Sequence, residues 1–280
     1  MTVRALIKDG ATRLAAAGVP DPRLDAEYLL AEALHAPRLN LLLSMETAVP
    51  PAAAEQFENS LHRREMREPL QYILGSQPFF GLTLTVTPDV LIPRGDTETL
   101  CEWALDTLPR TAPAQVLDLC TGSGALAIVI RHERPQAQVT AADISPAALA
   151  VARQNACALH VAVQFVQGDL FAPVAGQVFD LIVSNPPYIP TGDLSGLQRE
   201  VQFEPSLALD GGADGLDFYR RILRDAPRHL SAEGRLGLEI GDGEADVVFA
   251  MMASDFEDIR TLCDLGGRTR VVAGRKKHGH

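Results

Sequence analysis

The sequence predicts an α/β fold with a Rossmann-like, mostly parallel sheet of seven strands, preceded by a small all-α domain. From residue 96 onward, short apolar runs typical of buried strands alternate with helical segments. The first of these runs leads directly into a glycine-rich turn at residues 120–124. Helical patterns fill the N-terminal part of the chain. We therefore expect a helical domain over residues 1–75, a β-hairpin linker over residues 76–95 and the α/β domain over residues 96–280.

The composition is that of a soluble globular protein. With 280 residues, of which 46% are hydrophobic, the chain can bury a full core. The formal charge of −11 argues against a broad electrostatic grip on nucleic acid. The four cysteines are scattered, so we expect reduced thiols, no metal site and a cytoplasmic location. No apolar run is long enough to span a membrane, and we expect a monomer without membrane partners.

The N-terminal region shows apolar positions at helical spacing, interrupted by glycine and proline. The sequence Gly18-Val19-Pro20 ends the first predicted helix, and Asp21-Pro22 caps and starts the second. Pro50-Pro51 opens a later helix. The arginines within residues 63–67 are expected to face water. Because this region contains no catalytic constellation, we expect it to pack and to recognise the substrate.

The linker alternates apolar and polar residues over residues 82–87, which predicts a strand or a hairpin. A helix follows, and Asp96 or Thr97 is expected to cap its start. Trp103 stands at helical spacing with leucines and is expected in the core.

A predicted strand at residues 115–119 runs into the glycine-rich turn, and a helix follows to about Ile130. This sequence of elements opens a nucleotide-binding α/β unit. Glycine lets the backbone approach a ligand closely, and a helix start offers free N–H groups. The residues expected to bind a cofactor here are Asp118, Cys120, Thr121, Gly122, Ser123 and Gly124.

Two further acids stand at predicted strand ends. Asp143 lies about 20 residues past the glycines, the spacing at which a carboxylate meets ribose hydroxyls. Asp169 follows the third strand, where it or the neighbouring backbone at Leu170 can meet an adenine edge.

The tetrapeptide Asn185-Pro186-Pro187-Tyr188 follows an apolar strand at residues 179–184, at the edge where open α/β sheets bind ligands. The prolines hold the chain extended and cannot continue a sheet ladder. The Asn185 side-chain oxygen and the Pro186 carbonyl are two acceptors that suit an –NH2 group. Tyr188 can close over a planar amide or base. Taken alone, the tetrapeptide is also ordinary turn chemistry.

The rest of the chain predicts further α/β units. The connection at residues 189–215 is long, which favours a substrate-facing lid. The tail at residues 275–280 is expected to be solvated. Between them we expect helices near residues 216–230 and 244–253, and strands near residues 234–240, 259–263 and 269–272.

Two classes of enzyme fit the glycine-rich turn. Residues 122–127 match the G-x-G-x-x-A pattern of dinucleotide dehydrogenases, but a lone match is weak. The same turn binds S-adenosylmethionine, which shares the adenosine and lacks the pyrophosphate. The tetrapeptide at residues 185–188 separates the two classes, because methylation of a nitrogen needs acceptors for an –NH2 group and hydride transfer does not.

Residues 118–124, Asp143, Asp169 and the tetrapeptide together resemble the motifs of class I S-adenosylmethionine methyltransferases that methylate amino groups. Further stretches are similar to the release-factor glutamine methyltransferase, or HemK, family, and they run over nearly the whole chain. These stretches are residues 67–75, 91–94, 96–98, 200–205, 211–219 and 238–241.

The resemblance implies a reaction and its participants. A methyl group would pass from S-adenosyl-L-methionine, leaving S-adenosyl-L-homocysteine, to the side-chain amide nitrogen (N5) of the glutamine in the Gly-Gly-Gln motif of peptide chain release factors. Asn185 and Pro186 would accept the two amide hydrogens, and Pro187 and Tyr188 would pack against the glutamine. Asn185 would also contact the cofactor. Asn185, Pro186 and Tyr188 are thus the expected catalytic residues.

Three alternatives remain. The related ribosomal-protein glutamine methyltransferases tend to lack the run that stands here at residues 94–98. Adenine and cytosine amino methyltransferases share the tetrapeptide, but the acidic balance of the chain counts against duplex DNA. A methyltransferase-like module that only binds a partner is the third.

Three residues depart from the family's usual pattern. Gly95 stands where the family usually has proline, so we expect a looser turn before Asp96. Leu170 stands where some members have an aromatic residue, so we expect weaker adenine packing. Cys120 stands where the family usually has glycine, and a side chain is expected to be tolerated there if φ is negative.

Overall fold

The computed structural model of the protein describes residues 1–278 and contains two compact units. The first consists of Met1–Ser76 together with Gln198–Phe203. The second consists of Gln77–Leu197 together with the chain from Glu204 onward. Each unit has a hydrophobic core of its own. Gly279 and His280, the end of the tail that was expected to be solvated, lie outside the described residues.

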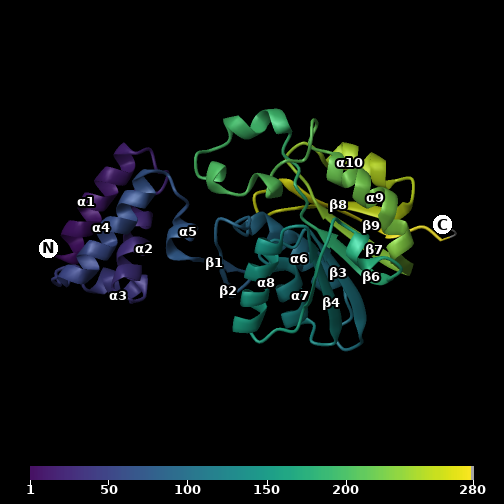
Figure 1. Cartoon of the computed structure of the whole chain (residues 1–280), viewed down its shortest axis with the longest axis horizontal. Helices are drawn as coiled ribbons and strands as arrows, with labels where there is room; N and C mark the ends of the chain where they lie inside the picture. The colour runs from purple at the N-terminus through teal and green to yellow at the C-terminus, as the bar shows by residue number, and fades with distance from the viewer. Residues whose placement is uncertain (279–280) are drawn as a thin grey trace. The chain divides into compact units, whose positions relative to one another are not determined.

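The first unit is an all-α bundle, as expected (Figure 1). The side chain of Thr2 caps α1 by accepting from the backbone N–H of Ala5. Prolines begin α2 and α4, where the missing N–H costs nothing because it has no intrahelical partner. The apolar faces of α1, α2 and α4 meet around Phe57 and Leu61. The helices are α1 (Val3–Ala16), α2 (Pro22–Ala33), α3 (Arg38–Leu43), α4 (Pro51–Glu65) and α5 (Leu70–Leu74).

The prediction that the arginines near the end of α4 face water is wrong for Arg64. Its buried side chain donates to Asp25 at 2.7 Å and to Glu200 at 2.9 Å. Arg67 donates to both carboxylate oxygens of Glu200, at 2.6 Å each. Two guanidinium groups therefore hold one carboxylate, and Gln198–Phe203 belongs to this unit although Glu200 lies 133 residues after Arg67. Local sequence could not indicate such a distant partner.

The second unit is built on a seven-stranded, mostly parallel sheet, which confirms the predicted fold class. The strand order is β5-β4-β3-β6-β7-β9-β8. The pairs from β5 to β7 are parallel, and β9 is antiparallel to both of its neighbours. A separate two-stranded sheet is formed by β1 (Ser76–Phe79) and β2 (Leu82–Thr85). The main strands are β3 (Ala114–Leu119), β4 (Ala137–Asp143), β5 (Gln164–Gln167), β6 (Phe179–Ser184), β7 (Leu230–Glu239), β8 (Phe256–Cys263) and β9 (Thr269–Lys276).

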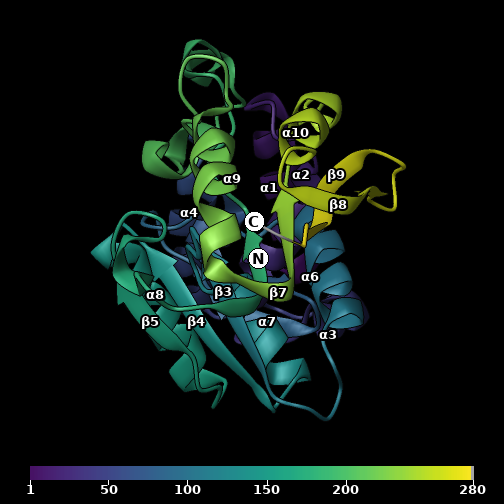
Figure 2. The same cartoon turned by 90° about the vertical axis from the view of Figure 1, so that its right-hand side faces the viewer.

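Helices cover both faces of this sheet (Figure 2). On one face, α6, α7 and α8 pack with Val116 and Val183, and the expected core residue Trp103 is buried there. On the other face, α9 and α10 pack with Leu117 and Ile182. Adjacent strand residues point to opposite faces, so strands covered on both sides read as continuous apolar runs. These helices are α6 (Gly95–Thr107), α7 (Ala125–Glu133), α8 (Pro146–Ala158), α9 (Asp217–His229) and α10 (Ala245–Met252).

The direction of the strand order reverses at β3, because the chain adds β4 and β5 on one side and β6 and β7 on the other. In open α/β sheets, ligands bind at such a point, beyond the carboxyl ends of the strands. The glycine-rich turn after β3, Asp143 at the end of β4 and Asn185 after β6 therefore meet at one sheet edge.

Two local predictions are wrong. Helix α6 begins at Gly95, so Asp96 and Thr97 lie in its first turn and do not cap it. The prediction of a solvated tail is wrong for Arg275 and Lys276, because β9 continues to Lys276 and ion pairs hold Arg275, whereas His278 is exposed. The ion-pair partners of Arg275 are Glu233, Glu257 and Asp258.

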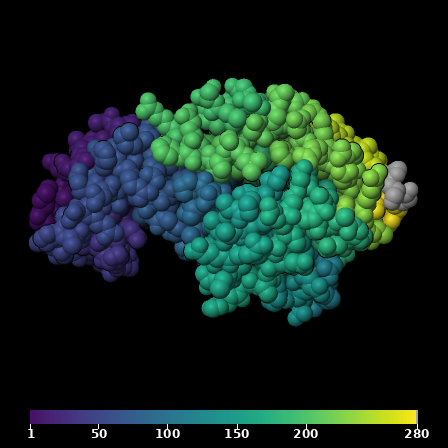
Figure 3. Space-filling model, viewed as in Figure 1, coloured from purple at the N-terminus to yellow at the C-terminus, as the bar shows by residue number. Residues whose placement is uncertain are grey.

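The connection between β6 and α9 is long, as expected, and contains three 3-10 turns. They are η2 (Thr191–Gly196), η3 (Val201–Phe203) and η4 (Ser206–Ala208). Its side chains appear in green at the upper border of the space-filling view (Figure 3). Among residues 1–278, no helix combines the length and apolarity needed to cross a membrane.

Candidate active site

Asp118, the penultimate residue of β3, stabilises the glycine-rich turn (residues 120–124) through hydrogen bonds. Its Oδ2 accepts hydrogen bonds from Thr121 Oγ1 at 2.6 Å and from the backbone N–H of Ala127 at 3.3 Å. Burial raises the pKa of Asp118 to about 7, although the hydrogen bond from Thr121 opposes that shift. Its Oδ1 has no partner among the described residues. Asp118 does not line the pocket described below, so its predicted contact with a cofactor remains untested.

Gly124 closes the turn against two helices. Its φ of +85° lies in the left-handed region, which favours glycine. A Cβ atom there would also lie 3.0 Å from Ile128 Cδ1 and 3.2 Å from Ala152 Cβ. The turn can therefore stay close to α7 and α8 only because this side chain is absent.

Asp143 connects the glycine-rich turn to the start of α8. Its Oδ2 accepts from the backbone N–H of Gly122 at 2.8 Å, and its Oδ1 accepts from the backbone N–H of Ser145 at 2.9 Å. Burial raises the pKa of Asp143, and the two N–H groups oppose that shift. Each carboxylate oxygen keeps further acceptor capacity for a ligand hydroxyl.

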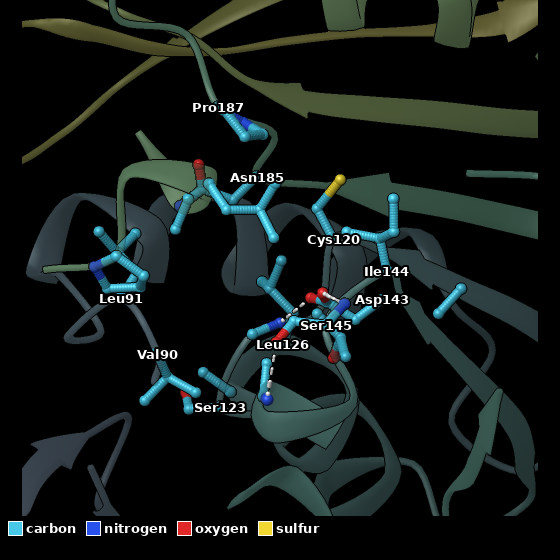
Figure 4. Close-up of a pocket in the computed structure, with 18 of the residues that line it drawn as sticks. Val90, Leu91, Cys120, Ser123, Leu126, Asp143, Ile144, Ser145, Asn185 and Pro187 are labelled. Atoms are coloured by element: carbon cyan, nitrogen blue, oxygen red, sulfur yellow. Dashed lines mark hydrogen bonds between the residues drawn. The ribbon is translucent and has the colours of Figure 1, made fainter. Parts of the chain in front are cut away.

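A pocket opens at this sheet edge, and it gathers most of the predicted cofactor residues. In Figure 4, Asn185 and Cys120 lie on one side of it, and Val90 and Leu91 lie across from them. Of the predicted residues, those that line the pocket are Cys120, Thr121, Gly122, Ser123, Asp143, Asp169, Leu170, Asn185 and Pro187. Asp118, Gly124, Pro186 and Tyr188 are not among its lining residues.

Asp169 is paired with a helix that sequence reasoning did not connect to the site. Its carboxylate accepts from Arg221 of α9 at 2.6 Å, and the Arg221 guanidinium lies 5.7 Å from the ring centroid of Phe218. Arg221 and Phe218 line the same pocket, beside Leu170. The α9 start thus borders the part of the pocket where an adenine ring was expected.

Cys120 does not meet the condition expected for a side chain at its position. Its φ is +59°, in the left-handed region, where a Cβ atom is strained. Burial raises the pKa of its thiol, and the neighbouring charge of Asp143 acts in the same direction. The thiol therefore lines the pocket in its protonated form at neutral pH.

Asn185 lines the pocket from the end of β6. Its Nδ2 donates to Thr97 Oγ1 of α6 at 3.3 Å. Because the side-chain amide is planar, its oxygen lies on the branch opposite the nitrogen that Thr97 engages. No hydrogen bond to Thr97 therefore engages the Asn185 oxygen, and its role as an acceptor stays a prediction.

The residues after Asn185 are held by close backbone approach. Gly211 donates its N–H to the Ile189 carbonyl at 2.8 Å. A Cβ atom at Gly211 would lie 2.7 Å from Tyr188 Cα, and one at Gly215 would lie 2.4 Å from the Tyr188 carbonyl oxygen. Burial raises the pKa of the Tyr188 hydroxyl. The absence of side chains at Gly211 and Gly215 thus lets the connection pack directly against the backbone of residues 185–188 (the NPPY loop).

Sequence reasoning missed a wall of the pocket, the lining residue Thr97 and the buried Glu239. The wall residues are Val90, Leu91, Pro205, Leu207 and Ala208. Glu204 joins its two segments by accepting from the backbone N–H of Ile92 at 3.0 Å and pairing with Arg94. Thr97 was treated only as a helix cap, and Glu239 was noted only within a similar stretch. An acid at the end of an apolar strand was the available signal for Glu239.

The pocket residues fit an adenosine-containing sulfonium cofactor. Asp143 retains acceptor capacity for ribose hydroxyls, and the backbone of the glycine-rich turn borders the same space. Ile144 and Leu170 offer apolar surface for a base. No group of three or more metal-ligating side chains is gathered for an ion anywhere in residues 1–278.

Solved structures with the same fold are methyltransferases. A methyltransferase from Pyrococcus furiosus aligns with a TM-score of 0.54 at 21% identity, covering 71% of this chain and 90% of that one. A 16S rRNA methyltransferase of T. Thermophilus, in complex with AdoMet and guanosine, aligns with a TM-score of 0.53 at 18% identity, covering 72% and 50%. The fold is therefore that of a class I methyltransferase.

Family models and curated relatives narrow this class. Residues 5–75 match the PrmC N-terminal domain, and residues 97–197 match the methyltransferase small domain. The release factor glutamine methyltransferase of Geobacter sulfurreducens is 46% identical, covering 98% of this chain and 96% of its own length. That of Moorella thermoacetica is also 46% identical, covering 99% of both chains. This chain belongs to the release factor glutamine methyltransferase family.

Proposed function

We propose that this protein transfers the methyl group of S-adenosyl-L-methionine to the side-chain amide nitrogen of the glutamine in the Gly-Gly-Gln motif of peptide chain release factors. The relatives that span nearly the whole chain support this substrate, and they are named for it. The helical unit matches the family's N-terminal domain, and we propose that it recognises the release factor.

The observation that most supports the reaction is the state of Asn185. It lines the pocket, and its Nδ2 is engaged by Thr97, which leaves its oxygen available to accept. An amide nitrogen is a weak nucleophile because its lone pair is delocalised into the carbonyl. Two acceptors for its hydrogens favour a tetrahedral nitrogen as positive charge develops, and this interaction strengthens in the transition state.

In this mechanism the bound cofactor supplies an activated methyl group on a sulfonium. Asn185 Oδ1 and the Pro186 carbonyl hold the glutamine –NH2 so that its lone pair faces the methyl carbon. Tyr188 and Pro187 pack against the glutamine side chain. The nitrogen–carbon bond forms as the carbon–sulfur bond breaks, sulfur leaves as a neutral thioether, and the nitrogen releases one proton.

The test incubates the protein with labelled S-adenosylmethionine and, separately, with a purified release factor, a ribosomal protein substrate and duplex DNA. We expect label only in the release factor, and mass spectrometry should place it on the Gly-Gly-Gln glutamine. Label in the ribosomal protein or in DNA instead would replace the proposed substrate. Cofactor binding without transfer to any acceptor would leave only a binding module.

The Asn185→Ala variant tests the role of the loop. We expect kcat to fall by about 100-fold or more, as when one oriented transition-state hydrogen bond is removed. The Kd for S-adenosylhomocysteine should change much less, because the glycine-rich turn and Asp143 are intact. Near-normal turnover in this variant would refute the mechanism.

A further inference from the structure

Glu239 ends β7 beside the NPPY loop. Strands β6 and β7 are parallel neighbours, and Ser184 pairs in register with Leu238. The next residues, Asn185 and Glu239, therefore leave the sheet side by side at its carboxyl edge. Glu239 is 2% exposed, so its carboxylate is enclosed by the protein.

The Glu239 side chain lies beside those of Asn185 and Thr97. The Thr97 hydroxyl and the Asn185 side chain lie close enough to the Glu239 carboxylate for each to lower its pKa. Asn185 Nδ2 also donates to Thr97 Oγ1, at 3.3 Å. An ionised carboxylate can only accept, and a neighbouring hydroxyl that turns its one hydrogen toward that carboxylate can otherwise only accept. The Glu239 carboxylate and the Thr97 hydroxyl therefore both favour the –NH2 end of the Asn185 amide on their side.

The position of Glu239 is not explained by stability. Its Oε2 has no hydrogen-bond partner among the described residues, and a buried acceptor without a donor costs free energy. Burial raises the pKa of Glu239 to about 7, with the nearby Thr97 hydroxyl opposing that shift. A neutral or apolar side chain would be less costly at this place.

We infer that Glu239 is a positioning residue, which together with Thr97 fixes the Asn185 side-chain amide with its oxygen toward the methyl-accepting nitrogen. This inference rests on the proposed function, since it assigns how the acceptor of the reaction is oriented. Without the carboxylate, the amide can turn over and present an –NH2 group to the substrate –NH2. Two donors then face each other, and the productive complex is lost.

The first experiment replaces Glu239 by the nearly isosteric Gln, whose side chain both donates and accepts. For Glu239→Gln we expect kcat to fall about 10- to 100-fold, by analogy with the loss seen when a partner that orients a metal-ligating side chain is removed. The Kd for S-adenosylhomocysteine should stay within about two-fold, and the thermal midpoint should not fall, because a buried charge is removed. Glu233→Gln is the matched control, since Glu233 lies exposed on the same strand, and it should retain wild-type kcat.

The pH profile gives a readout that a purely structural role would not change. Protonated Glu239 can donate, so it no longer dictates the amide orientation, and wild-type kcat should fall as the pH drops through about 7. Glu239→Gln should lack this inflection. The titratable and charged groups that face Glu239 are Asp96 and Cys101 of α6, Tyr188 after β6, Tyr219 of α9 and Arg270 of β9.

A spectroscopic readout separates this inference from the choice of substrate. The 15N-labelled side-chain –NH2 of Asn185 should titrate near pH 7 in the wild-type protein and should not titrate in Glu239→Gln. This measurement requires no methyl acceptor. If the wild-type protein methylates no release factor but the Asn185 resonance titrates, the proposed function is wrong. The role of Glu239 in orienting the Asn185 amide is then still supported.

Thr97→Val provides a second route if Glu239→Gln does not fold. It removes the hydroxyl link while it retains shape, and we expect kcat to fall several-fold with Thr97→Ser restoring it. The inference is overturned if the Asn185 resonance does not titrate. It is equally overturned if Glu239→Gln, or Thr97→Val in its place, keeps kcat within two-fold of wild type.

Discussion

Cys120 shows how a single residue can keep strain at a ligand site. Its backbone occupies the left-handed region and its side chain lines the pocket. A residue held there by its surroundings costs on the order of 1 kcal/mol or more. The hydrogen bonds of Asp118 and Asp143 to the glycine-rich turn hold the backbone in place, so the turn tolerates a side chain at this strained position.

The reactivity of Cys120 follows from its surroundings. Burial and the charge of Asp143 raise the pKa of its thiol, and the thiolate is the reactive form. At pH 8, iodoacetamide should therefore modify Cys120 more slowly than the exposed Cys157 and Cys263, as followed by mass spectrometry. Bound S-adenosylhomocysteine should slow it further without affecting the other two. Equal rates at all three thiols, or no protection by the ligand, would contradict this placement.

At the scale of elements, the start of α6 determines where Thr97 lies. Arg94 precedes the helix in an extended conformation, with φ −101° and ψ 149°. Gly95 takes the first helical position, and a Cβ atom there would meet no neighbour within 4 Å. Thr97 then falls in the first turn, where its hydroxyl reaches Asn185.

Gly95→Pro should stabilise the protein by about 0.5–1 kcal/mol. Proline suits the first helical position, and the extended Arg94 is compatible with a following proline. The gain comes from restricting the unfolded chain. The expected thermal midpoint is a few degrees higher by scanning fluorimetry. The Gly95→Ala variant is the control, because it removes the glycine without adding the proline ring. A lower thermal midpoint for Gly95→Pro than for wild type would contradict the placement of Gly95 at the first position of α6.

The connection between β6 and α9 supports the NPPY loop by backbone contact. In Gly211→Ala the new methyl group would meet the Tyr188 Cα and the Gly215 carbonyl oxygen, both 2.7 Å away. These are backbone atoms, so we expect a loss of about 1–3 kcal/mol in stability together with a lower kcat. Gly192→Ala in the same connection is the control, because a Cβ atom there would meet nothing within 4 Å. Equal effects of the two variants would refute the role of close approach.

At the scale of the whole molecule, a distant segment completes the helical unit. Burial acts to raise the pKa of Glu200, but the hydrogen bonds from Arg67 and Arg64 outweigh it and lower the pKa to about 2. The native carboxylate is thus more acidic than in the unfolded chain. Its stabilisation is present above about pH 4.5 and is lost as the pH falls toward 2.

Glu200→Gln should free Gln198–Phe203 from this unit. The buried Arg64 and the half-buried Arg67 would lose their shared charge partner, which costs about 3 kcal/mol. We expect faster proteolytic cleavage and faster amide exchange at residues 198–203 near neutral pH, and a smaller difference from wild type near pH 3. Glu58→Gln breaks an exposed ion pair with Arg13 in the same unit and should have little effect. Unchanged protection in Glu200→Gln would refute the role of the ion pairs.

The sequence by itself determined the alternating strands and helices, the glycine-rich turn and the NPPY loop. Each of these is a local pattern, in which residues a few positions apart share one element or one turn. The parallel order of the sheet then brings Cys120, Asp143 and Asn185 to one edge without further information.

Only the tertiary structure decided which polar groups serve the loop. Thr97, Asn185 and Glu239 come from three elements and meet only after the sheet has formed. Arg64 is buried because Glu200 reaches it from far along the chain. The burial and charge state of such a group depend on everything packed around it, and no local pattern contains that information.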